Sequence, residues 1–148
     1  MKKSFLPLLV LLSAGGLSTA FSQAAIPEPE LPNVDQPVVL TGADPLASLE
    51  EQLNSGPFDR RGAFATAFDE AERTVDARLS EMRARGLVFA DEAESNLTLA
   101  RDGSRQAFRD LSLTTNETWQ SARHNAVLAL RKLRGSLGAL ERTATGRP

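Results

Sequence analysis

The sequence predicts an all-α protein, either an elongated antiparallel helical bundle or a coiled-coil hairpin. No proline occurs from Phe58 to Arg147, and such long proline-free segments are typical of helices. Alanine and leucine supply most of the apolar side chains, and both favour helix. Aromatic residues make up only 5% of the chain, which favours narrow helices over a globule with a deep pocket.

A short first helix is expected over 45–54. Asp44 offers a capping side chain, and a proline follows at the first helical position. Three leucines then recur at helical spacing, and the segment 54–57, Asn-Ser-Gly-Pro, ends the element.

A long helix is expected over 58–85. Its apolar residues recur in steps of three and four, which places them on one face of a helix. They are Phe64, Phe68, Ala71, Val75, Leu79 and Met82. Gly86 follows a basic last turn and is suited to a C-cap.

Two further helices are expected over 88–112 and 115–141, or one continuous helix over 88–141. The segment 114–117, Thr-Thr-Asn-Glu, fits a capping box and favours two helices. Gly103 is a weak point in the first of them, and two glycines are expected to fray the end of the second.

An eleven-residue period runs across these segments. The spaced residues are Phe64, Val75, Gly86, Leu97, Phe108, Trp119 and Leu130. Such a period keeps an apolar stripe nearly straight along a helix. Near-straight helical bundles and amphipathic helices that lie on lipid both show it.

The first 24 residues predict a secretory signal peptide that is cleaved. A pair of lysines precedes an apolar run over 5–12, and small residues follow. That run is far shorter than the roughly 20 residues that span a bilayer. We expect cleavage after Ala24, with Ala20 as the competing site, and a mature product in the periplasm or outside the cell.

The mature chain is expected to have three parts: a leader over 25–43, a helical domain over 44–141 and a flexible tail over 142–148. Four prolines and three acids predict that the leader is disordered. Residues 25–56 carry six acids and no base, whereas residues 116–148 carry six bases and two acids. The basic stretch is expected to meet lipid head groups or the N-terminal segment, unless its charges form a solvated face.

No catalytic, cofactor or metal site is expected. The chain has no cysteine, and one histidine without cysteines does not make a usual zinc site. His124 lies on the polar side of its helix, where a surface role is favoured over that of a general base. No phosphate-binding loop, dinucleotide fingerprint or nucleophile elbow occurs. An acidic chain without aromatic platforms among basic residues also disfavours nucleic-acid binding.

Trp119 has two interpretations. It shares the apolar stripe of its helix, which favours a core position. It could instead lie at a lipid head-group boundary or a partner contact, surrounded by the basic residues Arg123, Arg131, Lys132 and Arg134.

Residues 111–140 resemble a known type of protein. The segments Leu-Ser-Leu-Thr-Thr-Asn-Glu-Thr-Trp-Gln and Ala-Val-Leu-Ala-Leu-Arg-Lys-Leu are similar to those of small bacterial coiled-coil proteins of the stress-response type. Those proteins have two charged helices followed by an amphipathic segment that carries a tryptophan. The resemblance covers about 58–141, although this chain departs from the pattern by its signal peptide and its single mature lysine.

Together these observations predict an exported, non-enzymatic protein that acts through protein–protein contacts or self-association. An envelope or stress-associated scaffold is the expected role. The alternative is a peripheral protein that binds anionic lipid through its amphipathic helices.

Overall fold

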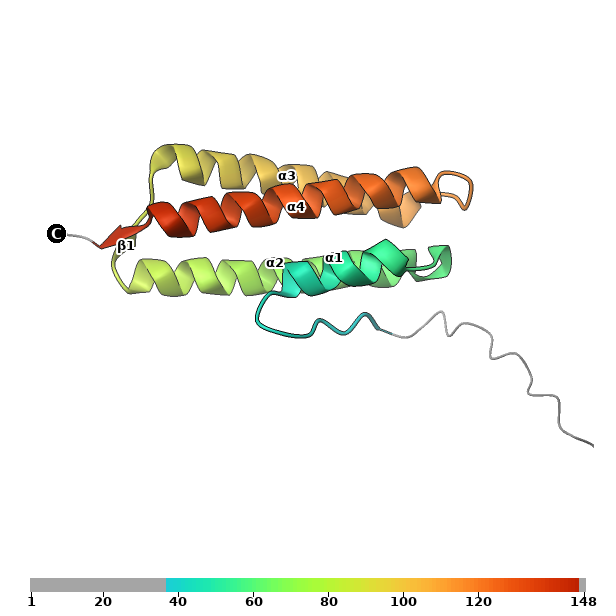
Figure 1. Ribbon diagram of the computed structural model, residues 1–148, viewed down its shortest axis with the longest axis horizontal. Coiled ribbons are helices and arrows are strands. Elements are labelled where there is room, and N and C mark those ends of the chain that lie inside the picture. Colours follow the sequence, from blue (N-terminus) through green and yellow to red (C-terminus); the bar gives the residue numbers. More distant parts are fainter. Residues whose placement is uncertain (1–36, 147–148) are drawn as a thin grey trace, which may run out of the picture. The chain divides into compact units, whose positions relative to one another are not determined.

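The computed structural model describes residues 37–146, which form four antiparallel α-helices packed side by side (Figure 1). The helices are α1 (Pro45–Ser55), α2 (Arg61–Ala84), α3 (Asp91–Leu113) and α4 (Trp119–Thr143). A single 3-10 turn, η1 (Phe58–Arg60), precedes α2. Two short strands, β1 (Leu87–Val88) and β2 (Thr145–Gly146), pair antiparallel at one end of the helices. The predicted all-α antiparallel bundle is confirmed. The predicted signal peptide lies outside the described residues.

The ends of α1 and α2 follow the sequence signals. Asp44 Oδ1 accepts a hydrogen bond of 3.0 Å from the Ala47 backbone N–H, and Pro45 is the first helical residue. After α2, Gly86 has φ +78°, a left-handed conformation that favours glycine. Gly56 is needed for another reason, since a Cβ there would lie 2.2 Å from the Phe64 ring.

α3 and α4 are separate helices, and α4 begins later than predicted. The threonines of the expected capping box bond to Thr118 instead of opening a helix at 115. Thr118 Oγ1 accepts from the Thr115 backbone N–H at 3.2 Å and lies 2.7 Å from Thr114 Oγ1. These contacts close a turn over 114–118, and α4 starts at Trp119. The continuous helix over 88–141 is therefore wrong.

α4 also ends later than predicted. Gly135 and Gly138 lie inside the helix, which continues to Thr143. The buried side chains of Leu137 and Leu140 hold this segment against the core, which offsets the roughly 1 kcal/mol that each glycine costs a helix. Because Thr145 and Gly146 then pair with β1, the predicted flexible tail is corrected over 142–146.

The last residues of the predicted leader are ordered. Val38 is buried, the Val39 carbonyl accepts a 2.7 Å hydrogen bond from Gln52 Nε2, and the Thr41 N–H donates to Ser48 Oγ at 3.0 Å. Val38 and Leu40 in this short segment pack onto the core, whereas the Val39 side chain is exposed. The disordered leader is therefore corrected over 37–43, and residues 25–36 lie outside the described part.

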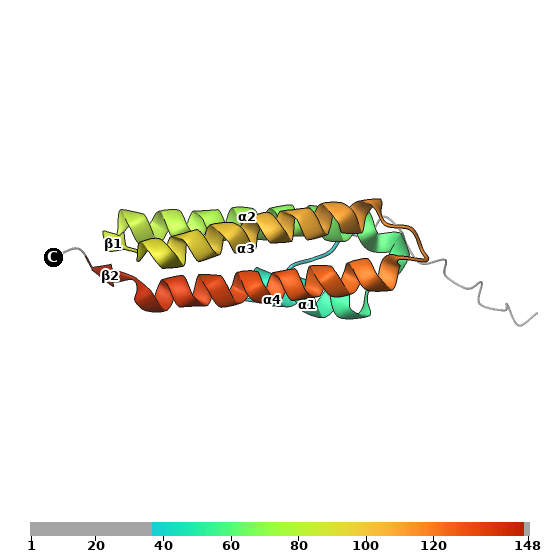
Figure 2. The same ribbon diagram turned by 90° about the horizontal axis from the view of Figure 1, so that it is seen from above.

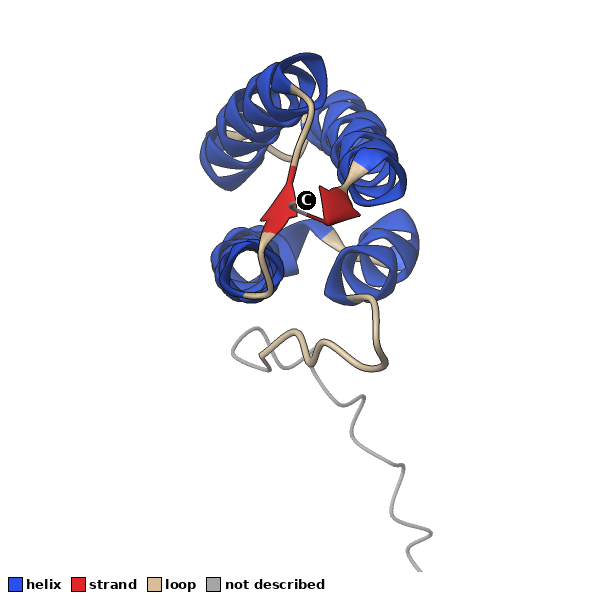
Figure 3. Cartoon of the chain, turned by 90° about the vertical axis from the view of Figure 1, so that its left-hand side faces the viewer, coloured by secondary structure: helices blue, strands red, loops and turns tan. Residues whose placement is uncertain are grey.

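The core follows the eleven-residue period. Of the spaced residues, all except Gly86 are buried, although the chain reverses direction between them. Phe68 of α2 stacks on Phe108 of α3 with ring centroids 4.3 Å apart. The period therefore marks buried positions on successive helices. Figure 3 shows these helices arranged around a shared centre.

α1 covers only part of the bundle. It runs beside α4 from Arg123, whose NH1 group donates to the Gly56 carbonyl, to Arg134, whose Nε atom donates to Asp44. Figures 1 and 2 show α1 beside one half of α2 and α4. That half has four helices in cross-section and the other half has three, closed at its end by the β1–β2 pair.

Candidate functional site

The residues proposed from the sequence do not form one site. Trp119 is 4% exposed and belongs to the core, where it lies edge-on to Phe58 at 6.0 Å and stacks on Phe64 at 6.4 Å. This position supports the interpretation of Trp119 as a core residue. Contact with lipid or a partner would require the bundle to open.

Two of the predicted basic residues are paired within the chain. Arg131 Nε lies 2.6 Å from Glu50 Oε1, and Arg134 bridges Glu50 Oε2 at 3.0 Å and Asp44 Oδ2 at 3.1 Å. Glu50 is the least exposed member, with 13% of its side chain accessible. The acidic surface that α4 meets here is therefore α1 of the same chain.

The other two predicted basic residues differ from each other. Arg123 donates to Gln120 Oε1 at 2.6 Å and to the Gly56 carbonyl at 3.5 Å, so it holds the α1–η1 turn. Lys132 is exposed and points away from α1, and it makes no ion pair with another described residue.

A second charged network joins α2 to α3. Glu72 is 9% exposed and accepts from Arg101 Nε at 3.1 Å and Arg105 Nε at 2.8 Å. Arg101 also binds Asp76, with its NH1 group 2.7 Å from Oδ1. The hydrogen bond from Arg101 lowers the pKa of Asp76, so the stabilisation from this pair is present above the ordinary carboxyl pKa and is lost as the pH falls through the lowered value. The network sets the register of the two helices, and its charges are mutually satisfied.

α3 and α4 meet without such a network. Ser104 is fully buried between them, and its hydroxyl lies 2.9 Å from the Ala100 carbonyl of α3 and 3.1 Å from the Ala129 carbonyl of α4. Small residues recur on both sides of this contact: Ala93, Ala100 and Ala107 on α3, and Ala122, Ala126 and Ala129 on α4. Small side chains let the two backbones approach closely.

The outward side of this helix pair carries two shallow grooves. One is lined mainly by Ala93, Asn96 and Leu99 of α3 and by Lys132, Gly135 and Ala139 of α4. The other is lined mainly by Gly103, Gln106 and Asp110 of α3 and by Ser121, Ala122 and Asn125 of α4. We call these two grooves, with Leu128 on the adjoining surface of α4, the α3–α4 face.

The α3–α4 face exposes leucine side chains. Leu99 is 62% exposed and Leu128 is 47% exposed, although both lie on helices with a well-filled core. Sequence reasoning missed both leucines because they do not lie on the apolar stripe of their helices. A leucine outside that stripe was itself the signal that could have identified them. Most of their neighbours on the face are uncharged, which distinguishes it from the ion-paired sides of the bundle.

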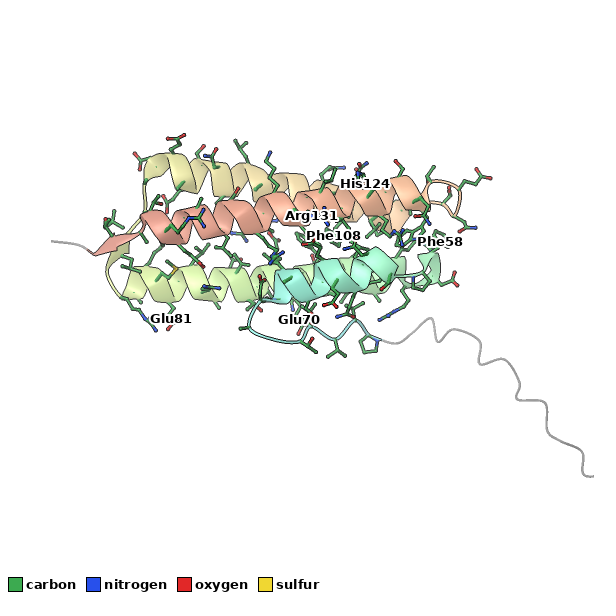
Figure 4. All side chains as sticks on the ribbon, in the orientation of Figure 1. Phe58, Glu70, Glu81, Phe108, His124 and Arg131 are labelled. Atoms are coloured by element: carbon green, nitrogen blue, oxygen red, sulfur yellow. The ribbon has the colours of Figure 1, made fainter. Side chains whose placement is uncertain are left out.

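Two other features of the described residues bear on chemistry. His124 is exposed on the outside of α4 (Figure 4) and lines a small polar pocket with Asn54, Gln120 and Arg123. Over 37–146, no group of three or more acidic or histidine side chains is placed to hold a metal ion. Among the helices of this same part, none combines the length and apolar character needed to cross a membrane.

Comparison with known proteins gives no match: no family model, curated protein or solved structure resembles this chain closely enough to be reported. The resemblance to coiled-coil proteins of the stress-response type therefore stays an interpretation of the sequence.

Proposed function

We propose that this chain is an exported, non-enzymatic helical bundle that works by protein–protein contact through its α3–α4 face. The observation that supports the proposal most directly is the exposure of Leu99 and Leu128 on a largely uncharged surface. Exposed apolar side chains within a polar rim are typical of binding surfaces. The grooves and pockets described on residues 37–146 are shallow and open, which suits contact with a protein surface better than enclosure of a small substrate.

A site-specific cross-link tests the contact. The photoreactive residue p-benzoylphenylalanine is placed at position 99 and, as a matched control, at position 81, which is exposed on α2 away from the face. We expect discrete cross-linked adducts from position 99 when the protein is irradiated in cells that make it, and none above background from position 81. Equal labelling at both positions, or no adduct at 99, would remove the basis of the proposal.

Export is tested on the same material. Sequencing the N-terminus of the protein recovered outside the cytoplasm should read Ala25 after cleavage at the preferred site, or Phe21 after cleavage at Ala20. A product that keeps Met1 and remains in the cytoplasm would contradict export and would leave the binding surface to be judged separately.

In the lipid-binding alternative, contacts within the bundle would have to break so that lipid could replace them. Trp119 would have to leave the core, and Arg131 and Arg134 would have to leave the acids of α1. Circular dichroism and tryptophan fluorescence with and without vesicles containing phosphatidylglycerol distinguish the two functions. The protein-contact function predicts no change in either signal, whereas lipid binding predicts a change in both.

A further inference from the structure

The α3–α4 face carries charged side chains that are not neutralised within the chain. The acids belong to α3 and the bases to α4. Glu92 of α3 and Lys132 of α4 line one groove, whereas Asp102 of α3 and Arg142 of α4 lie beside the grooves and line neither. Glu92, Lys132 and Arg142 make no ion pair with any described residue, and Asp102 has only a 3.6 Å contact with Arg105. An acidic edge beside a basic edge is a self-complementary pattern.

The bond between Ser104 and Ala129 fixes the level of these charges along the helices, because α3 and α4 run antiparallel. Asp102 lies two residues before Ser104, and Lys132 lies three residues after Ala129, so the two occupy nearly the same level. Glu92 and Arg142 lie twelve residues before Ser104 and thirteen residues after Ala129. At about 1.5 Å of rise per residue, each acid is within a few ångströms of the level of one base.

We propose that the α3–α4 face binds the same face of a second copy of this chain, with the two-fold axis parallel to the helices. This inference rests on the proposed function and names its partner. In that arrangement α3 of each copy packs on α4 of the other at the same level. Asp102 then faces Lys132 of the second copy, and Glu92 faces Arg142. An axis perpendicular to the helices would instead place α3 on α3 of the second copy and α4 on α4.

The apolar side chains fit the same arrangement. Leu99 lies five residues before Ser104 and Gly135 six residues after Ala129, so Leu99 faces Gly135 of the second copy. Leu128 likewise lies near the level of Gly103. A Cβ atom added at either glycine would meet nothing within 4 Å, so the surface above each is open. Each leucine therefore has a recess opposite it, as in the packing of ridges into grooves between helices.

Single-cysteine variants test the arrangement, because the chain has no cysteine of its own. A two-fold axis parallel to the helices runs along the boundary between α3 and α4. Each residue at that boundary then lies close to the same residue of the second copy, over the whole length of the helices. Asn96→Cys and Asn125→Cys lie in the two different grooves, and both should form disulfide-linked dimers under mild oxidation. Glu81→Cys, exposed on α2, is the matched control and should stay monomeric. Cross-linking of neither variant above the control, or linkage only between Asn96→Cys and Asn125→Cys chains when they are mixed, would overturn the proposal.

Charge reversal gives a second, independent measurement. Sedimentation equilibrium should show that Lys132→Glu weakens self-association by about tenfold and that Asp102→Lys added to it restores most of the affinity. Circular dichroism confirms that each variant keeps its helices. A wild-type chain that is monomeric at every concentration tested would overturn self-association. If position 99 still cross-links to a protein of another mass in cells, the proposed function survives without this partner.

Discussion

α4 makes two antiparallel seams, one with α3 and one with α1, and different side chains hold them. The α3–α4 seam is built from alanines around the buried Ser104, whose hydroxyl reaches the Ala129 carbonyl. The α1–α4 seam combines buried leucines with the ion pairs of Glu50 to Arg131 and Arg134.

The difference explains where charge lies on the molecule. Long arginine and glutamate side chains need space to reach each other, whereas small side chains let helices approach until no such pair fits. α1 has only 11 residues, and a helix this short gains little stability by itself, so its contacts with α4 must hold it. The close-packed seam requires no charges, which leaves the outward α3–α4 face for the proposed contact.

The largest expected effect comes from the leucines of α1. Leu49 is fully buried, so Leu49→Ala should lower the free energy of unfolding by about 2–5 kcal/mol, since it removes buried apolar surface and leaves a cavity. Urea denaturation followed by circular dichroism measures the loss. Leu113→Ala is the control, because Leu113 is 81% exposed and should change stability by less than about 0.5 kcal/mol. Similar effects of the two substitutions would show that α1 is not part of the folded core.

A smaller effect is expected at the close-packed seam. Ser104→Leu should destabilise the protein by about 1–3 kcal/mol, because the larger side chain has no space between α3 and α4. Ser104→Ala keeps the close approach and removes only the hydrogen bonds, at about 1 kcal/mol. The melting temperatures of the two variants decide between these expectations, and a leucine variant more stable than the alanine variant would refute the close packing.

The smallest effect is expected at the ion pairs of α1 and α4. Glu50→Gln should lose about 1 kcal/mol at low salt, and this loss should shrink at 1 M salt because screening weakens the pairs in the parent protein. Glu81→Gln removes an exposed pair with Arg85 within α2 and serves as the comparison, with almost no loss expected. The measurement is urea denaturation at both salt concentrations, and a loss for Glu50→Gln that does not depend on salt would argue against an electrostatic role.

The fold was largely predictable from the sequence because the period of its apolar residues is local information. Asp44 marks the start of a helix by its capping side chain and Gly86 marks the end of one by its left-handed backbone, and both positions were predicted correctly. The errors arose where tertiary contacts outweigh local preference. Burial of Leu140 carries α4 past its glycines, and mutual bonding of the threonines at 114–118 delays its start.

The candidate site was less predictable because a face between two helices depends on which helices are neighbours. The basic residues of α4 were noticed as a group, yet Arg131 and Arg134 point to α1 whereas Lys132 points to the outward groove. The positions of these residues along α4 do not determine which neighbouring helix each side chain faces. Leu99 and Leu128 become a shared surface only once α3 and α4 are placed together.

The pairing of β1 with β2 has a consequence for the last turns of α4. The turn over 114–118 joins α3 and α4 at one end, and the pairing of Leu87 with Gly146 and of Val88 with Thr145 holds them at the other. The segment from β1 to β2 is thus a closed loop in which the end of α4 cannot unwind freely. Opening of its final turns must separate the strands as well, so amide hydrogens in the two regions share one opening event and exchange together.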